Sequence, residues 1–258
     1  MGKLIYNFGR KVGSAINKGK WYYQSTFGSE GDALKAELAV GRELARQISQ
    51  QTKIINDAAK QIILDDVGHR LQQRLVNKKR GFKFYLIASK DINAFALPGG
   101  LIFITDLLFK RIADKRDEIA FVLAHEMMHI VFRHPMEKIF ADYSTKVITR
   151  LLVKGGTLGL LAKQMLVNLL NSSYSQDKEL EADEYAVRLS YRAGFNPRGA
   201  EALLSKLKNG STENLAVFHY FLSHPPIEQR IAHIDSIMKA HDMKLKFEPI
   251  SLGNEASS

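Results

Sequence analysis

The chain has 258 residues, of which 45% are hydrophobic, and its formal net charge is +10. This length suffices for one domain with a full hydrophobic core and a peripheral arm. Because the sequence contains no cysteine, disulfides, thiolate nucleophiles and cysteine-ligated zinc are excluded, and any metal site must use histidine, aspartate and glutamate.

Half of the net charge lies in the first 28 residues, which contain five lysines and arginines and no acidic residue. Apolar residues recur there at roughly helical spacing, a pattern typical of a basic amphipathic helix on an anionic membrane surface. A helix that folds back on the domain would produce the same pattern. Nothing that resembles a DNA-reading or RNA-reading module accompanies the charge, so we expect no nucleic-acid partner.

This arm lacks both a long apolar stretch after its charges and a small-residue cleavage site, so it does not resemble a secretory signal. We therefore expect a cytoplasmic protein, either free or held peripherally at the inner face of the membrane through residues 1–28. The expected organisation is a basic arm over residues 1–30, one folded domain over 31–250 and a disordered tail over 251–258.

Hydrophobic periodicity and turn residues predict helices first and a small group of strands next. The expected elements are helices over residues 31–51 and 57–76, strands over 82–89 and 101–105, and between them a short strand with a Pro-Gly-Gly turn over 92–100. Helices should resume at about residue 114 and continue nearly to the end. The predicted fold class is α+β, mostly helical, with a small mixed sheet ahead of the histidine-containing helix described below.

The segment from Val147 to Leu170 is apolar enough to be tested as a membrane span. Arg150, Lys154 and Lys163 interrupt it, so it falls short of the roughly 18 consecutive apolar residues that a spanning helix needs. We expect a helical hairpin instead, broken at the two glycines 155–156.

The run LAHEMMHI, residues 123–130, places two histidines four residues apart inside an apolar helix. At 3.6 residues per turn, His125 and His129 lie on one face, so both imidazoles can reach one point while Glu126 projects beside them. Two imidazoles and a nearby carboxylate suit Zn²⁺, and the pattern is the metallopeptidase motif H-E-x-x-H. The alternative, surface or capping histidines, is disfavoured by the apolar neighbours.

A catalytic zinc ion needs a third protein ligand and one open position. The best source is the helix predicted over residues 175–194, where Glu179 and Asp183 lie one turn apart beside the small residues Ala182 and Ala186. In that arrangement Glu179 would be the oxygen ligand, and Asp183 would orient a histidine ring from behind. Taken alone, the stretch fits an acidic, solvated helix more simply.

Four other polar residues near these motifs carry weaker expectations. His224, held by two prolines, is a candidate donor to the oxyanion, although it could merely mark a loop before a helix. Arg230 in that following helix could brace the site, although a surface arginine is the plain alternative. Glu181 and Glu184 point to other faces of the 175–194 helix and are expected to be exposed.

The motifs LAHEMMH, ELEAD and SHPPIEQR, together with NAFALPGG and ELAVGRELA, resemble the HtpX and CAAX prenyl endopeptidase family of zinc metallopeptidases, which are gluzincins. The resemblance extends from about residue 37 to 239 and implies a zincin-like domain with one Zn²⁺ per chain. The implied roles are His125, His129 and Glu179 as metal ligands, Glu126 as general base, Asp183 as support and His224 near the oxyanion. One departure is Gln176, where the family often has arginine.

The stretch Asn93 to Ala96 has a substrate-binding role available to it. A short strand at the sheet edge exposes backbone N–H and C=O groups, to which an extended peptide can add as another strand. We assign Asn93, Ala94, Phe95 and Ala96 to this role, and the alternative is an interior strand with a tight turn. Such binding would favour unfolded or flexible polypeptides.

The predicted function is zinc-dependent hydrolysis of peptide bonds in such polypeptides, by a water that the metal polarises and Glu126 deprotonates, within protein quality control. One alternative is a chaperone-like protein that holds unfolded chains without cutting them. Another is a peripheral membrane interaction protein that acts through the basic arm. The presence of Glu126 argues against pure binding, because a base has no role there. The sequence does not predict an oligomeric state.

Overall fold

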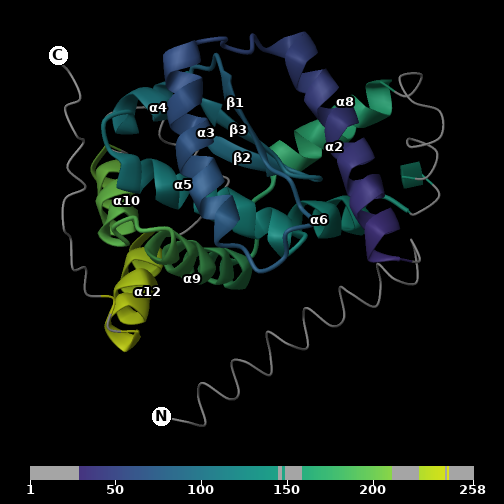
Figure 1. Ribbon diagram of the computed structural model, residues 1–258. Coiled ribbons are helices and arrows are strands. Elements are labelled where there is room, and N and C mark those ends of the chain that lie inside the picture. Colours follow the sequence, from purple (N-terminus) through teal and green to yellow (C-terminus); the bar gives the residue numbers. More distant parts are fainter. Residues whose placement is uncertain (1–28, 145–146, 149–158, 211–226, 242, 244–258) are drawn as a thin grey trace, which may run out of the picture.

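The computed structural model describes residues 29–144, 147–148, 159–210, 227–241 and 243 (Figure 1). Its elements are α2 (Glu30–Gln51), α3 (Ala58–Gln73), β1 (Lys83–Ile87), β2 (Ala94–Leu97), β3 (Leu101–Thr105), α4 (Asp106–Ile112), α5 (Arg116–Val131), α6 (His134–Asp142), α8 (Gly159–Asn171), α9 (Gln176–Arg192), α10 (Arg198–Gly210) and α12 (Ile227–Ala240). The predicted α+β class, mostly helical with a small mixed sheet, is confirmed.

The three strands form one sheet in the order β1-β3-β2. Central β3 pairs parallel with β1 and antiparallel with β2, so Phe103 lies opposite Tyr85 on one side and Phe95 on the other. All five positions of β3 are buried, which explains why its sequence is almost entirely apolar. The turn from β2 to β3 contains Gly99 and Gly100 at φ values of 79° and 95°, which glycine adopts readily.

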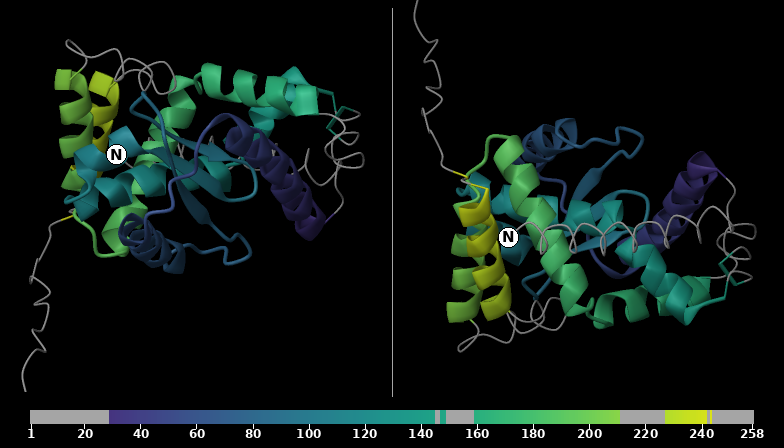
Figure 2. Two further views of the ribbon diagram at one scale, coloured as in Figure 1. Left: turned by 90° about the horizontal axis from the view of Figure 1, so that it is seen from above. Right: turned by 90° about the horizontal axis from the view of Figure 1, so that it is seen from below.

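The sheet separates two hydrophobic cores, because neighbouring side chains of a strand point to opposite faces. On one face, Ile102 and Ile104 join a first core with α3, α5, α9, α10 and α12. On the other face, Leu101 and Phe103 join a second core with α2, α6 and α8. Figure 1 shows α3 and α5 on one side of the sheet and α2 and α8 on the other. Helices α10 and α12 lie side by side in both views of Figure 2.

Helix α5 is the centre of the first core. Every residue from Glu118 to Ile130 is buried, because α5 packs against β2 and α3 and against α9 and α10. Ala182 and Ala186 of α9 are fully buried, and such small side chains let two helices approach closely. The fold therefore brings the H-E-x-x-H residues of α5 against the acidic helix α9.

Most sequence-predicted boundaries agree with the fold, and the disagreements have local causes. Helix α3 ends at Gln73 rather than at residue 76. The next residue, Arg74, donates its N–H to the carbonyl of Leu71 and closes the last turn. The expectation that helices resume only at residue 114 is wrong. Helix α4 starts directly after β3, and its first turn is capped by the Thr105 hydroxyl, which accepts from the N–H of Leu108.

Several expectations fall on residues that the structure does not describe. The arm over residues 1–28, the tail over 251–258 and the glycine break at 155–156 lie outside the described residues, so membrane contact and the expected location stay predictions. Part of the expected hairpin is present as α8. Among the described helices, none combines the length and the apolar character that crossing a membrane would require.

Candidate metal centre

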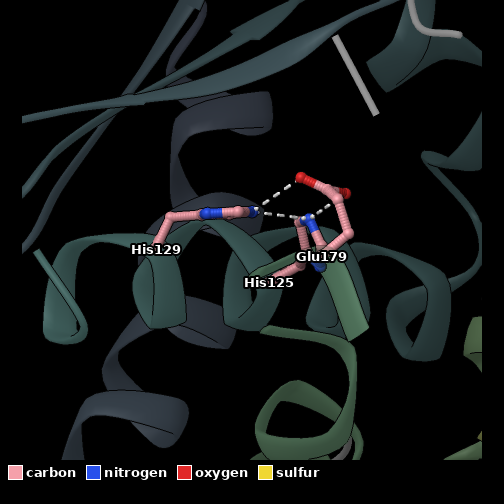
Figure 3. Close-up of side chains that lie close together, drawn as sticks. All are labelled: His125, His129 and Glu179. Atoms are coloured by element: carbon pink, nitrogen blue, oxygen red, sulfur yellow. Dashed lines mark hydrogen bonds and ion pairs between the residues drawn. The ribbon is translucent and has the colours of Figure 1, made fainter. Parts of the chain in front are cut away.

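His125 and His129 from α5 and Glu179 from α9 point toward one another (Figure 3). The two histidine Nε2 atoms are 3.0 Å apart, and the Glu179 carboxylate oxygens lie 3.6 Å from Nε2 of His125 and 3.4 Å from Nε2 of His129. A tetrahedral zinc ion with bonds of about 2.0–2.1 Å requires ligand atoms roughly 3.3 Å apart. The spacing of these three donors therefore fits a single zinc-sized ion.

The charges around these donors also favour a divalent cation. Glu126, Glu179 and Asp183 are three buried carboxylates, and Arg230 is the buried guanidinium beside them. When ionised, these three carboxylates outnumber the guanidinium beside them. A bound divalent cation would offset this excess of negative charge, which is costly in a buried site.

The two imidazoles differ in their affinity for protons. Burial and the charge of Arg230 lower the pKa of His125, but hydrogen bonds to Asp183 and Glu179 outweigh them and raise the pKa to about 9. The metal-free site therefore holds a proton on His125 that a metal ion would displace. Burial holds the pKa of His129 well below its usual value, which keeps this imidazole in the neutral form that coordinates metals.

A buried ion pair supports His125. The Asp183 carboxylate lies 2.9 Å from Nδ1 of His125, and Arg230 donates to both oxygens of Asp183 at 2.7 and 2.8 Å. Burial raises the pKa of Asp183, but the Arg230 charge and these hydrogen bonds lower it to about 2. Both side chains are fully buried, so the alternative of a surface arginine is wrong, and Arg230 contacts the carboxylate that lies against His125.

Different groups support His129. Its Nδ1 lies 2.9 Å from Nδ1 of His134, and its ring stacks on Tyr174 with the centroids 4.2 Å apart. Nε2 of His134 in turn lies 3.5 Å from a carboxylate oxygen of Glu181. Sequence reasoning missed His134 and Tyr174. The signals that could have pointed to them are their positions in the chain: His134 follows His129 by five residues, and Tyr174 comes just before α9.

The expectation that Glu181 and Glu184 are exposed is wrong. Their side chains are only 18% and 12% exposed, because α9 packs against both α5 and α12 and little of its surface stays open. Glu184 pairs with Arg188 at 2.8 Å within the same helix. Glu181 instead faces His134 and belongs to the surroundings of His129.

The remaining predicted residues have separate outcomes. His224 lies outside the described residues, so its role stays a prediction. Glu126 is buried and directly follows His125 in the chain, and its charge is one of the causes, after burial, that raise the pKa of Tyr174. At Gln176, where the resembling family often has arginine, the side-chain amide donates to Gln229, so a neutral hydrogen bond stands in place of an ion pair.

The predicted substrate-binding stretch lies along the edge strand β2. Within the described parts of the chain, β2 lies at an edge of the three-stranded sheet and packs against α5, which disfavours the alternative of an interior strand. Ala94 and Ala96 are buried, and Phe95 stacks on Phe103. The side-chain oxygen of Asn93 is buried and has no hydrogen-bond partner among the described residues. Substrate binding at these residues stays a prediction.

Comparison with known proteins assigns these residues to one family. Residues 58–238 match the model of Peptidase family M48. The beta-barrel assembly-enhancing protease of Escherichia coli (strain K12) is 28% identical over 231 residues, which cover 83% of this chain and 47% of that protein. Metalloprotease LoiP of the same organism is 30% identical over 190 residues, 70% of each chain, and metalloprotease YcaL is 27% identical over 234 residues, 85% of each chain. The chain thus spans about half the length of the first of these relatives.

Proposed function

The chain belongs to peptidase family M48, and on this basis we propose that it is a zinc-dependent metalloendopeptidase. The observation that supports the proposal best is the buried triangle of His125, His129 and Glu179, with Glu126 next to one of its corners in the sequence. Family membership agrees with the resemblance seen in the sequence and disfavours a protein that only binds unfolded chains.

The three donors would hold one metal ion per chain and leave one coordination position open. Two imidazole nitrogens and one carboxylate oxygen favour zinc over magnesium or calcium, which prefer oxygen ligands. When bound, zinc would supply Lewis-acid activation of a water molecule and of the peptide carbonyl.

The residues of the chain would then carry out the proton transfers and hold the ligands in position. Glu126 would accept the proton of the attacking water and deliver it to the leaving amine as the peptide bond breaks. Asp183 would accept a hydrogen bond from Nδ1 of His125, which turns Nε2 toward the metal, and Arg230 would hold Asp183 in place. His224 is our candidate for a donor to the oxyanion.

We propose unfolded or flexible polypeptides as substrates. The edge of β2 beside α5 offers backbone groups to which an extended chain could add. The buried side chains of Ala94 and Ala96 would leave recognition mainly to the backbone. A role in protein quality control agrees with this substrate class and with the name of one relative, a beta-barrel assembly-enhancing protease.

The proposal is tested by measuring metal content and cleavage of unfolded casein by the purified full chain. We expect one zinc ion per chain and chelator-sensitive cleavage. Glu126→Gln keeps volume and polarity but removes the base, so it should keep zinc and lose about 10²–10⁴-fold in rate. A wild-type protein without bound metal, or near wild-type cleavage by zinc-loaded Glu126→Gln, would contradict the proposal.

A further inference from the structure

His134 connects a proposed metal ligand to a carboxylate on another helix. Its Nδ1 is 2.9 Å from Nδ1 of His129, and its Nε2 is 3.5 Å from Oε2 of Glu181. The first distance is that of a hydrogen bond, whereas the second is long for a direct one. His134 is 3% exposed, so both ring nitrogens have to find partners inside the protein.

An unusual turn places His134 there. If α5 continued as a helix, residue 134 would lie about 140° around the axis from His129 and would face away from it. Arg133 breaks the helix instead, at φ 64° and ψ 20°, and α6 starts with His134 and Pro135. The left-handed conformation is unfavourable for a residue other than glycine, so something must hold Arg133 in it.

A buried carboxylate on α2 provides that restraint. Glu37 is 1% exposed, and its Oε1 lies 3.2 Å from Nε of Arg133. Arg80 donates to both oxygens of Glu37, at 2.5 and 3.2 Å, and fixes the carboxylate from its other side. Strained backbone persists where the surroundings determine it strongly, so this cluster fixes the turn that brings His134 to His129.

The hydrogen bond between the two rings determines where their protons lie. A neutral His129 that binds metal through Nε2 carries its single proton on Nδ1, which makes Nδ1 a donor. Nδ1 of His134 must then accept, so the proton of neutral His134 lies on Nε2. That proton faces Glu181, whose carboxylate can accept it after a small rotation of the side chain.

We propose that His134 and Glu181 are positioning residues for the ligand His129: His134 accepts the Nδ1 proton of His129, and Glu181 selects the tautomer of His134 that can do so. The inference rests on the proposed metal site, and it gives His129 the support that Asp183 gives His125. Histidine ligands generally need such a partner for the distal nitrogen. A neutral imidazole fills this role here, and the carboxylate lies one step further away.

The test compares zinc affinity, by chelator competition, among variants of the full chain. His134→Leu removes the acceptor and should weaken zinc binding by about 10–100-fold. His134→Asn places an amide oxygen near the former Nδ1 position and should restore most of the affinity, which a purely structural role would not predict. Glu181→Ala should weaken zinc binding less than His134→Leu, and Glu184→Ala, three residues along α9, is the matched control and should leave it unchanged.

A second measurement does not depend on whether the variants fold. Long-range ¹H–¹⁵N spectra of the zinc-loaded wild-type protein with labelled histidine should show His129 protonated on Nδ1 and His134 protonated on Nε2. Protonation of His134 on Nδ1, or wild-type zinc affinity in folded His134→Leu, would overturn the positioning role and leave the proposed function intact. If the wild-type protein binds no zinc, the proposed function fails and this inference fails with it.

Discussion

The two histidines of the proposed metal site have very different surroundings. His125 is backed by Asp183 and Arg230, an ion pair with no exposed surface. His129 is backed by the imidazole of His134 and the phenol ring of Tyr174, and the Glu181 carboxylate on that side is 18% exposed. Breaking a buried ion pair leaves an uncompensated charge. We therefore expect changes on the His125 side to destabilise the folded protein as well as the site. We expect changes on the His129 side to cost less stability and to act mainly on the affinity for the proposed metal ion.

Glu179 belongs to both sides, and its removal should have the largest effect. In Glu179→Ala the two imidazoles remain, but two ligands leave the ion under-coordinated. We expect loss of stoichiometric zinc and of casein cleavage, measured by metal analysis and a protease assay. Glu184→Ala, on another face of the same helix, should keep both. A zinc-loaded, active Glu179→Ala protein would refute the ligand assignment.

On the His125 side, Arg230→Leu should lower the stability of the folded protein. The substitution leaves the buried Asp183 carboxylate without its guanidinium partner, and it should lower the free energy of unfolding of the metal-free protein by about 3–5 kcal/mol. Urea unfolding measures this loss. The double variant Arg230→Leu with Asp183→Asn removes both charges and should regain a large part of it. A double variant as unstable as the sum of the two single variants would show that the pair does not act as a unit.

Lowering the pH should also reveal the contribution of the His125 side to stability. The pKa of Asp183 is about 2 in the folded protein, whereas the ordinary pKa of an aspartate without such partners is 3.8. A carboxylate with a lowered folded-state pKa contributes stability above its unfolded pKa and loses it as the pH falls through the folded one. The metal-free protein should therefore lose stability between about pH 4 and 2, in urea melts at stepped pH. Asp183→Asn should show a shallower loss, and an identical slope would contradict the assignment.

The smallest effect is expected at Tyr174, on the His129 side. The stacked ring is worth about 0.5–1.5 kcal/mol, so Tyr174→Ala should weaken zinc binding by no more than about tenfold. Tyr174→Phe keeps the ring over His129 and should bind zinc like the wild type in the chelator competition. If Phe and Ala weaken binding equally, the phenol hydroxyl rather than the ring supports the site.

The sequence predicted the parts of the fold and site that depend on local periodicity. Alternation and helical spacing located α2, α3 and the three strands, and the four-residue spacing placed His125 and His129 on one face. The small residues Ala182 and Ala186 pointed to Glu179, because a helix with such a face can approach its neighbour closely. These inferences succeed because side-chain direction within one helix or strand is fixed by its repeat.

Tertiary structure alone decided what stands behind the two histidines. The burial of Arg230 against Asp183 depends on how α12 packs on α9, which no local pattern contains. His134 reaches His129 because Arg133 leaves the helical conformation, and Arg133 does so beside Glu37, a residue of α2 far earlier in the chain. Glu181 was expected in solvent because the helical repeat fixes which way a side chain points, but only the packing of the neighbouring elements decides what it meets there.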